Sequence, residues 1–170
     1  MPGADRPDKL ADHPDTLRAR NKLAMSYLAA GKPAKAIPLY RQTLADCERV
    51  LGPNHSSTLR ARNNLAMSYL AAKRPAEAIP LLKRTLADCQ RVFRPDHPDT
   101  LTSRNNLAMA YRAAGRSAEA IPLLERTIAD YGRALGADHP DTKAARADLA
   151  AVTGEPQTAD ANPSAAADAE

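Results

Sequence analysis

The chain has 170 residues, enough for one modest domain, in which Ala, Leu and Arg abound while aromatic residues make up 4% and Trp is absent. Glycines are few and lie mostly between periodic segments, which makes extended β-structure a poor fit. The net charge of +4 is unevenly placed: the last basic residue is Arg146 and four acids follow residue 150, so residues 1–150 carry +8. A basic body before an acidic tail suggests an acidic partner or an internal contact.

The sequence shows no export signal and no membrane-spanning stretch. The N-terminal decapeptide MPGADRPDKL lacks the apolar run of a secretory signal. No segment approaches the roughly 18 apolar residues of a membrane span. These features predict a cytoplasmic protein that does not enter a membrane.

One stretch recurs along the chain. Asn63–Ala72, with the sequence NNLAMSYLAA, has close copies at 21–30 and 105–114. Four histidines mark the same interval of 42 residues: His13, His55, His97 and His139. A fixed period of this size is the signature of a stacked array of repeats.

We expect residues 1–12 to be a frayed, mostly irregular segment and the first full repeat to span 13–54. Its first helix should begin at Pro14 and stop at Gly31, because Gly readily takes the left-handed conformation of a helix end. Its second helix should begin at Pro33 and end before Gly52-Pro53. Apolar residues recur at helical steps of three and four on one face of each helix: Leu17, Leu23, Ala24 and Tyr27, then Ala36, Ile37, Tyr40, Leu44, Cys47 and Leu51.

The second repeat spans 55–96 and the third 97–138. Lys73 replaces the glycine that ends the first helix of the other two repeats, so this helix end should be less well capped. One proline lies about five residues into each second helix, where it should bend the helix mildly without breaking it. These prolines are Pro38, Pro80 and Pro122.

A fourth unit begins at His139 and then decays. Thr153 stands where the other repeats have Tyr, and no second apolar stripe follows. We expect one capping helix from about 140 to 152, which makes 139–153 a partial repeat. The acidic tail 154–170 is rich in Ala, Asp and Pro and lacks the apolar content needed to order itself.

The two cysteines, Cys47 and Cys89, hold the same place in successive repeats. Such positions should lie about one helix diameter, ~10 Å, apart, which is too far for a disulfide. We expect two small buried thiols, in agreement with a reducing compartment.

Several residues carry a resemblance to a known family. Leu65, Ala66, Tyr69, Ala78 and Leu82 match the alternation of small and large residues in tetratricopeptide repeats. The patterns His-Pro-Asp-Thr, Asn-Asn-Leu-Ala-x-x-Tyr, Glu-Ala-Ile-Pro-Leu-Leu and Arg-Val-Leu-Gly resemble the 42-residue subtype of kinesin light chains and many bacterial proteins. The resemblance covers about 13–153.

The resemblance implies an all-α fold, a right-handed solenoid of three antiparallel helix pairs and a capping helix, with the first helix of each pair on the concave face. The physics agrees, because one helix pair cannot bury its apolar stripe alone and must stack on its neighbours. The sequence departs from the family pattern at two sets of positions. Where the family usually has a bulky apolar residue, this chain has Arg20, Arg62 and Arg104. Where the family usually has Ala, it has Thr43, Thr85 and Thr127.

The inner stripe of the first helices is the candidate binding surface. Asn can hold a peptide backbone through its donor and acceptor, Met adapts to varied apolar groups, and Arg attracts carboxylates. In the kinesin light chain-like family, asparagines at this place contact extended peptides, and the pairs Asn63-Asn64 and Asn105-Asn106 match that motif. The alternative is that these residues only bridge adjacent helices. The candidate peptide-binding residues are Arg18, Asn21, Met25, Arg60, Asn63, Asn64, Met67, Asn105, Asn106, Met109 and Arg112.

Other constellations favour structural roles. The arginines at 20, 62 and 104 recur in register with Asp46, Asp88 and Asp130, so we expect ion pairs between helices. The histidines occur once per repeat and cannot converge on one metal, so packing or hydrogen bonding at the repeat junctions is expected. We see no catalytic set and no phosphate-binding loop, and we expect neither a metal nor a cofactor.

These patterns predict a non-catalytic scaffold whose electropositive concave groove binds an extended acidic segment of another protein. The alternative is a self-assembly module that stacks head-to-tail through its terminal repeats, or by placing the acidic tail in a groove. A nucleic-acid partner is disfavoured, because the tyrosines fall mostly on core positions and form no stacking platform.

Overall fold

The computed structural model describes residues 14–154, and this part of the chain folds into α-helices joined by short turns. The predicted segment 1–12 and all but the first residue of the predicted tail 154–170 lie outside the described residues. Within them there are seven helices: α2 (Pro14–Ala29), α3 (Pro33–Leu51), α4 (Ser56–Ala71), α5 (Pro75–Val92), α6 (Pro98–Ala113), α7 (Ser117–Leu135) and α8 (Pro140–Thr153).

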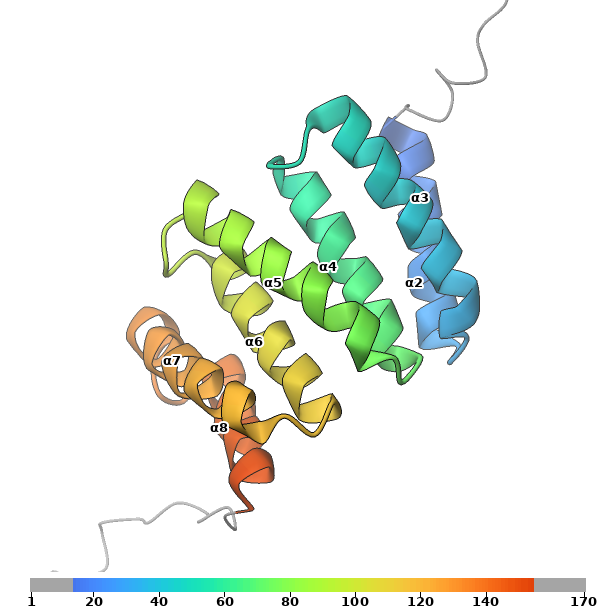
Figure 1. Ribbon diagram of the computed structural model, residues 1–170. Helices are drawn as coiled ribbons and strands as arrows, with labels where there is room; N and C mark the ends of the chain where they lie inside the picture. Colours follow the sequence, from blue (N-terminus) through green and yellow to red (C-terminus); the bar gives the residue numbers. More distant parts are fainter. Residues whose placement is uncertain (1–13, 155–170) are drawn as a thin grey trace, which may run out of the picture.

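The helices form two layers. In Figure 1, α3, α5 and α7 lie in front, while α2, α4, α6 and α8 lie behind them, and the row runs from α2 at one end to α8 at the other. Each helix packs on the next one in sequence, and in addition α4 contacts α6 and α6 contacts α8. The first helices of the repeats are therefore the more closely spaced, inner layer. The predicted all-α solenoid of stacked helix pairs is confirmed.

Histidine side chains begin the first helices of the later repeats. The Nδ1 atoms of His55, His97 and His139 each accept a hydrogen bond at 3.2 Å from the backbone N–H two residues further on. This bond satisfies one of the donors that a helix start leaves without a partner. The expected hydrogen-bonding role at the repeat junctions is thereby confirmed for these three, and His13 lies outside the described residues.

The first helices end alike, although one of them lacks glycine. Gly31 and Gly115 have φ values of 67° and 71°, and Lys73 takes the same left-handed conformation at 58°. The backbone N–H of Arg74 still donates to the carbonyl of Tyr69 at 2.9 Å. The helix end at Lys73 therefore loses no hydrogen bond. Its weakness is a conformational cost, because a residue with a Cβ is strained at this φ.

The three prolines do not interrupt their helices. Pro38, Pro80 and Pro122 lie inside α3, α5 and α7, which run on without a break. Each stands early in its helix, where the backbone bond that it removes is one of the first. The prediction that they do not break the helices is confirmed.

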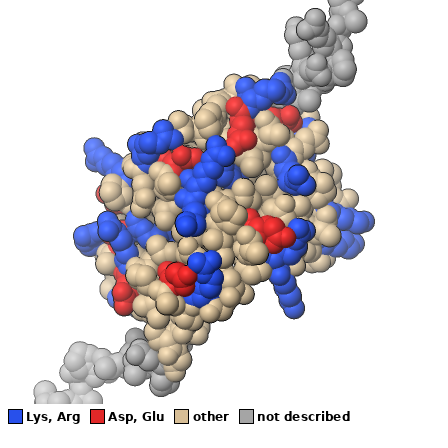
Figure 2. Space-filling view, viewed as in Figure 1, with Lys and Arg blue, Asp and Glu red and all other residues tan. Residues whose placement is uncertain are grey.

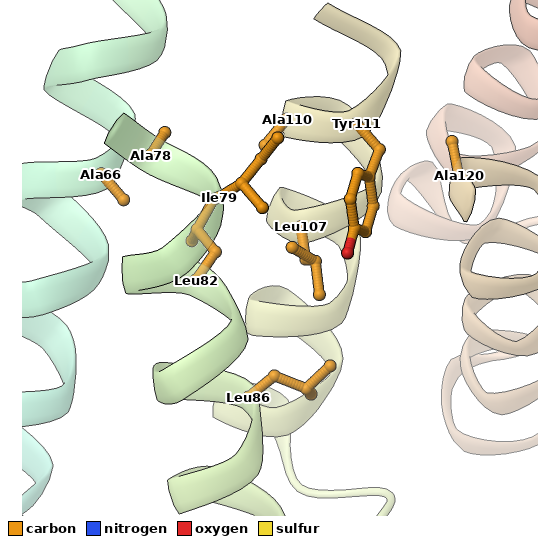
Figure 3. Close-up of a cluster of buried hydrophobic side chains, with 9 residues drawn as sticks. All are labelled: Ala66, Ala78, Ile79, Leu82, Leu86, Leu107, Ala110, Tyr111 and Ala120. Atoms are coloured by element: carbon orange, nitrogen blue, oxygen red, sulfur yellow. The ribbon is translucent and has the colours of Figure 1, made fainter. Parts of the chain in front are cut away.

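The core is a chain of similar clusters, one at each repeat junction. In Figure 3, Ile79, Leu82 and Leu86 point from α5 toward α6. They meet Leu107, Ala110 and Tyr111 of that helix, and Ala66, Ala78 and Ala120 complete the buried group. The small residues let the helices approach while the large ones fill the space between them.

The prediction that Leu23 belongs to this core is wrong. Leu23 is 48% exposed, whereas Leu65 and Leu107, at the equivalent positions of α4 and α6, are 5% and 4% exposed. The difference arises because α4 and α6 have the second helix of a preceding repeat packed against them. Among the described residues, no such helix covers α2.

Arginines bridge the repeats inside the stack. Nη1 of Arg62 donates to Asp88 at 2.8 Å and Nη2 donates to Glu48 of the preceding repeat at 3.0 Å. Burial by itself would raise the pKa of Asp88, but hydrogen bonds from Arg91 and Arg62 outweigh it and hold the pKa below its usual value. The Arg20–Asp46 and Arg104–Asp130 pairs repeat the arrangement at 2.6 and 2.5 Å, so the predicted ion pairs are confirmed.

The bridge is incomplete in the third repeat. Arg104 is fully buried, and its Nη2 atom has no hydrogen-bond partner among the described residues. The residue 42 positions after Glu48 is Gln90, which is exposed. The second repeat thus supplies a neutral amide at the position where the first repeat supplies a carboxylate.

Replacing Gln90 with Glu should therefore stabilise the protein. The new carboxylate would give the Nη2 atom of Arg104 the acceptor it lacks, which we expect to raise the free energy of unfolding by about 1 kcal/mol. The matched change Glu48→Gln should lower it by a similar amount. Urea unfolding followed by circular dichroism measures both, and a Gln90→Glu variant no more stable than the parent would contradict the equivalence of the two positions.

Candidate binding groove

The inner faces of α2, α4 and α6 carry the predicted site residues. Most of them are exposed or half-buried and thus reach solvent: Arg18, Asn21, Met25, Arg60, Asn63, Asn64, Met67, Asn105, Met109 and Arg112. Asn106 is buried. The opposite face, formed by α3, α5 and α7, carries both signs of charge side by side in Figure 2.

The asparagines form a row of hydrogen bonds between repeats. Nδ2 of Asn64 donates to Oδ1 of Asn21 at 3.3 Å, and Nδ2 of Asn106 donates to Oδ1 of Asn63 at 3.0 Å. Each bond joins the second Asn of one repeat to the first Asn of the repeat before. The bridging role that the sequence left open is therefore present. Asn64 uses one side-chain N–H for this bond, so its second N–H and its side-chain carbonyl oxygen stay outside the row, and the residue is half-buried.

The row ends at Asn105. Its Oδ1 atom is buried and has no donor among the described residues. The residue one repeat further on, at the position of Asn64 and Asn106, is Asp148, which as a carboxylate can only accept. Asp148 instead pairs with Arg112 at 2.9 Å, so the charge of Arg112 is balanced within the protein.

A pocket of 540 Å³ opens at the first repeat junction, and we call it the first pocket. Arg18 and Asn21 of α2 form one wall, while Arg60 and Asn64 of α4 form the other. The lining from α3 is mostly apolar, and Leu17 of α2 and residues of the following turn and helix complete the set: Thr43, Cys47, Val50, Leu51, His55, Ser57 and Ala61. The pocket thus combines amides, cationic groups and apolar surface in one concave site.

The equivalent pocket at the second junction is smaller and less basic. It measures 130 Å³ and is lined by Arg60, Asn63 and Cys89, but Asp99 and Thr102 stand in place of Ser57 and Arg60 of the first pocket. At the third junction, Tyr131 occupies the position of Cys47 and Cys89, and its ring is buried with Leu101 and Ala145. The side chain at this position is therefore the same at the first two junctions and larger at the third.

The positive charge of the groove is concentrated near its N-terminal end. Arg60 and Lys22 are exposed and have no carboxylate partner among the described residues, and Arg18 lies 3.9 Å from Asp15 in a solvated pair. Toward the other end Asp99 enters the second pocket and Asp148 neutralises Arg112. The sequence predicted an electropositive groove, and the basic residues without a carboxylate partner among the described residues lie in its first half.

The two cysteine side chains are packed in the core. Burial raises the pKa of the Cys47 and Cys89 thiols, which keeps them protonated, and both cysteines are free. Within residues 14–154, His, Cys, Asp and Glu form no cluster able to hold a metal ion. None of the helices described is long and apolar enough to cross a bilayer.

Comparison with known proteins assigns the family. A tetratricopeptide repeat model matches residues 15–91 and again 57–133, so the two matches together span most of the chain. The chain belongs to the tetratricopeptide repeat family. Repeats of this kind are typically non-catalytic scaffolds that mediate contacts between proteins. A search of curated protein sequences found no significant match.

Solved structures place the chain near kinesin light chains. It is similar to a kinesin light chain-like protein of Podosopora anserina with nearly identical repeats, with 34% identity and a TM-score of 0.78 over 84% of this chain and 69% of that one. A single-substitution variant of that protein matches equally well. BtubC from P. vanneervenii shares the fold at 21% identity and a TM-score of 0.72, over 82% of this chain and 57% of its own. The predicted kinesin light chain-like subtype is confirmed.

Several residues of the groove were missed in the sequence. Cys47 and Leu51 had been assigned to the apolar stripe and Val50 had been given no role, yet all three line the first pocket. Bridging by the asparagines had been left open, but their partners were not identified, because the bonded residues are 43 apart, one more than the period. Comparing residues 42 positions apart hides such an offset. Comparing each Asn with both asparagines of the next repeat would have revealed it.

Proposed function

We propose that the groove binds an extended, acidic segment of a partner protein, with the acidic residues of that segment at the N-terminal half. The observation that carries the proposal is the first pocket, which Arg18 and Arg60 line together with apolar side chains. Asn21 and Asn64 in the same pocket offer donors and acceptors to a peptide backbone. The fold presents these groups on stacked helices, which hold them in fixed register.

The arginines are a better test of this proposal than the asparagines. Replacing Asn63 with Ala would remove the acceptor of the buried Asn106 amide and disturb packing as well as binding. Arg18 and Arg60 are exposed, so changing them leaves the core intact. A matched control exists on the other face, where Arg41 of α3 and Lys83 of α5 are also exposed.

The double variant Arg18→Gln with Arg60→Gln should bind acidic peptides at least about tenfold more weakly, because two charge-assisted contacts are lost. The probes are random 12-residue peptides selected by phage display on the intact chain and then synthesised. We expect the selected peptides to be rich in Asp and Glu and to bind less tightly as salt rises. The double variant Arg41→Gln with Lys83→Gln should bind them normally. Selection of neutral peptides, or an equal loss in both variants, would overturn the proposal.

The alternative of head-to-tail self-assembly has weaker support from the geometry. The described residues begin and end with first helices, α2 and α8, so stacking two copies would bring together two helices of the same kind. On α8, Lys143 and Thr153 are exposed and stand at the positions of Leu101 and Tyr111 of α6, which are buried. The other form of this alternative, in which the acidic tail occupies a groove, involves residues outside the described range.

A further inference from the structure

The outer face of α2 repeats the residues of a buried interface. We define this face by Ala19, Arg20, Leu23 and Ser26. At the same positions α4 has Ala61, Arg62, Leu65 and Ser68, and α6 has Ser103, Arg104, Leu107 and Ala110, and all eight of these are buried. In α2, by contrast, Ala19, Leu23 and Ser26 are exposed.

The repeats themselves show what such a face binds. On α4 it is covered by α3, and on α6 by α5, which are amphipathic helices of 19 and 18 residues. Glu48 of α3 also reaches across this interface to Nη2 of Arg62 at 3.0 Å. On α2, Arg20 uses Nη1 for Asp46, and no described carboxylate contacts its Nη2. The face therefore offers an apolar seam together with a cationic donor at a known position.

We propose that the outer face of α2 binds an amphipathic helix of a partner protein that resembles α3, with an apolar stripe along one face and a Glu placed to reach Arg20. The helix would lie against α2 as α3 lies against α4, and it would continue the stack by one helix. This site is separate from the groove, because Leu23 and Ser26 point away from the first pocket's lining residues on the same helix, and the inference does not rest on the proposed function.

Two other occupants fit the face less well. A second copy of the chain has no free helix of this type, since α3, α5 and α7 are each already packed between two first helices. The sequence of residues 1–13 contains Pro2 and Pro7 and a single Leu, at position 10, so it provides no matching stripe. The residue one period before Glu48 is Arg6, which has the wrong charge to pair with Arg20.

The probe is a fluorescent synthetic peptide with the sequence of residues 33–51, carrying Cys47→Ser to prevent oxidation. Binding to the intact chain is followed by fluorescence anisotropy, and helix formation by circular dichroism. We expect saturable binding with a gain in helicity, because an isolated helix of this length is marginal in water. In the protein, Leu23→Arg should weaken binding at least about tenfold by placing a charge in the seam. In the peptide, Glu48→Gln should weaken it about threefold or more, through the lost contact with Arg20.

Two matched variants separate this site from the groove. Met25→Arg adds the same charge to an exposed position of α2 that belongs to the groove, and Arg18→Gln with Arg60→Gln alters the first pocket. Both should bind the helical peptide as the parent does. The proposal is overturned if the intact chain does not bind the peptide, or if Leu23→Arg binds it unchanged. It is also overturned if sedimentation shows a dimer without peptide that Leu23→Arg dissociates, because the occupant would then be a second copy.

Discussion

Replacing Asp130 with Ala should lower the free energy of unfolding by about 3–5 kcal/mol. Asp130 accepts a hydrogen bond from Arg104, and the two side chains are only 3% and 2% exposed. Removing the carboxylate would leave a buried guanidinium without a counter-ion, in a place where one of its nitrogens already lacks an acceptor. Urea unfolding followed by circular dichroism measures the loss.

The first repeat supplies the control. In the Arg20–Asp46 pair the side chains are 11% and 13% exposed, so water can solvate the arginine that remains, and Asp46→Ala should cost about 1 kcal/mol. A double variant, Arg104→Met with Asp130→Leu, should recover most of the stability that Asp130→Ala loses, because it removes both charges. Equal losses at Asp46 and Asp130 would show that burial does not govern the strength of these pairs.

Replacing Leu107 with Ala should cost about 2–4 kcal/mol, because it leaves a cavity in the cluster that joins α5 to α6. Leu23 stands at the equivalent position of α2, where nearly half of the side chain is in water. Leu23→Ala should therefore cost well under about 1 kcal/mol. The same chemical change at the same repeat position thus has two outcomes, set only by the presence of a neighbouring helix. A loss at Leu23 as large as that at Leu107 would show that the outer face of α2 is already covered in the isolated chain.

Most of the fold follows from the 42-residue period. Each repeat touches only its neighbours, so a sequence pattern that repeats also repeats its contacts. Helix ends, the histidine junctions and the Arg–Asp pairs could thus be predicted from spacing. Leu23 could not, because its sequence context matches that of Leu65 and Leu107, and its exposure depends on what is stacked on α2.

The groove was harder to predict than the fold. The stripe of Asn, Met and Arg follows from helical spacing, but the size of each pocket along it depends on side chains from several helices. Cys47 leaves a pocket open, whereas Tyr131 is buried at the same place. The charge distribution was also missed, since Asp148 reaches Arg112 from α8, a helix that the sequence assigned only to capping.

The bond between Asn106 and Asn63 shows how the protein could change its length without changing its selectivity. A whole unit inserted before α8 that carries both asparagines would supply the donor that Asn105 lacks, and Asp148 would again close the series. The first pocket, at the other end, would keep every residue that lines it. Under the proposed function, in which the first pocket selects the ligand, gene duplication can therefore adjust the span of the molecule independently of its choice of ligand.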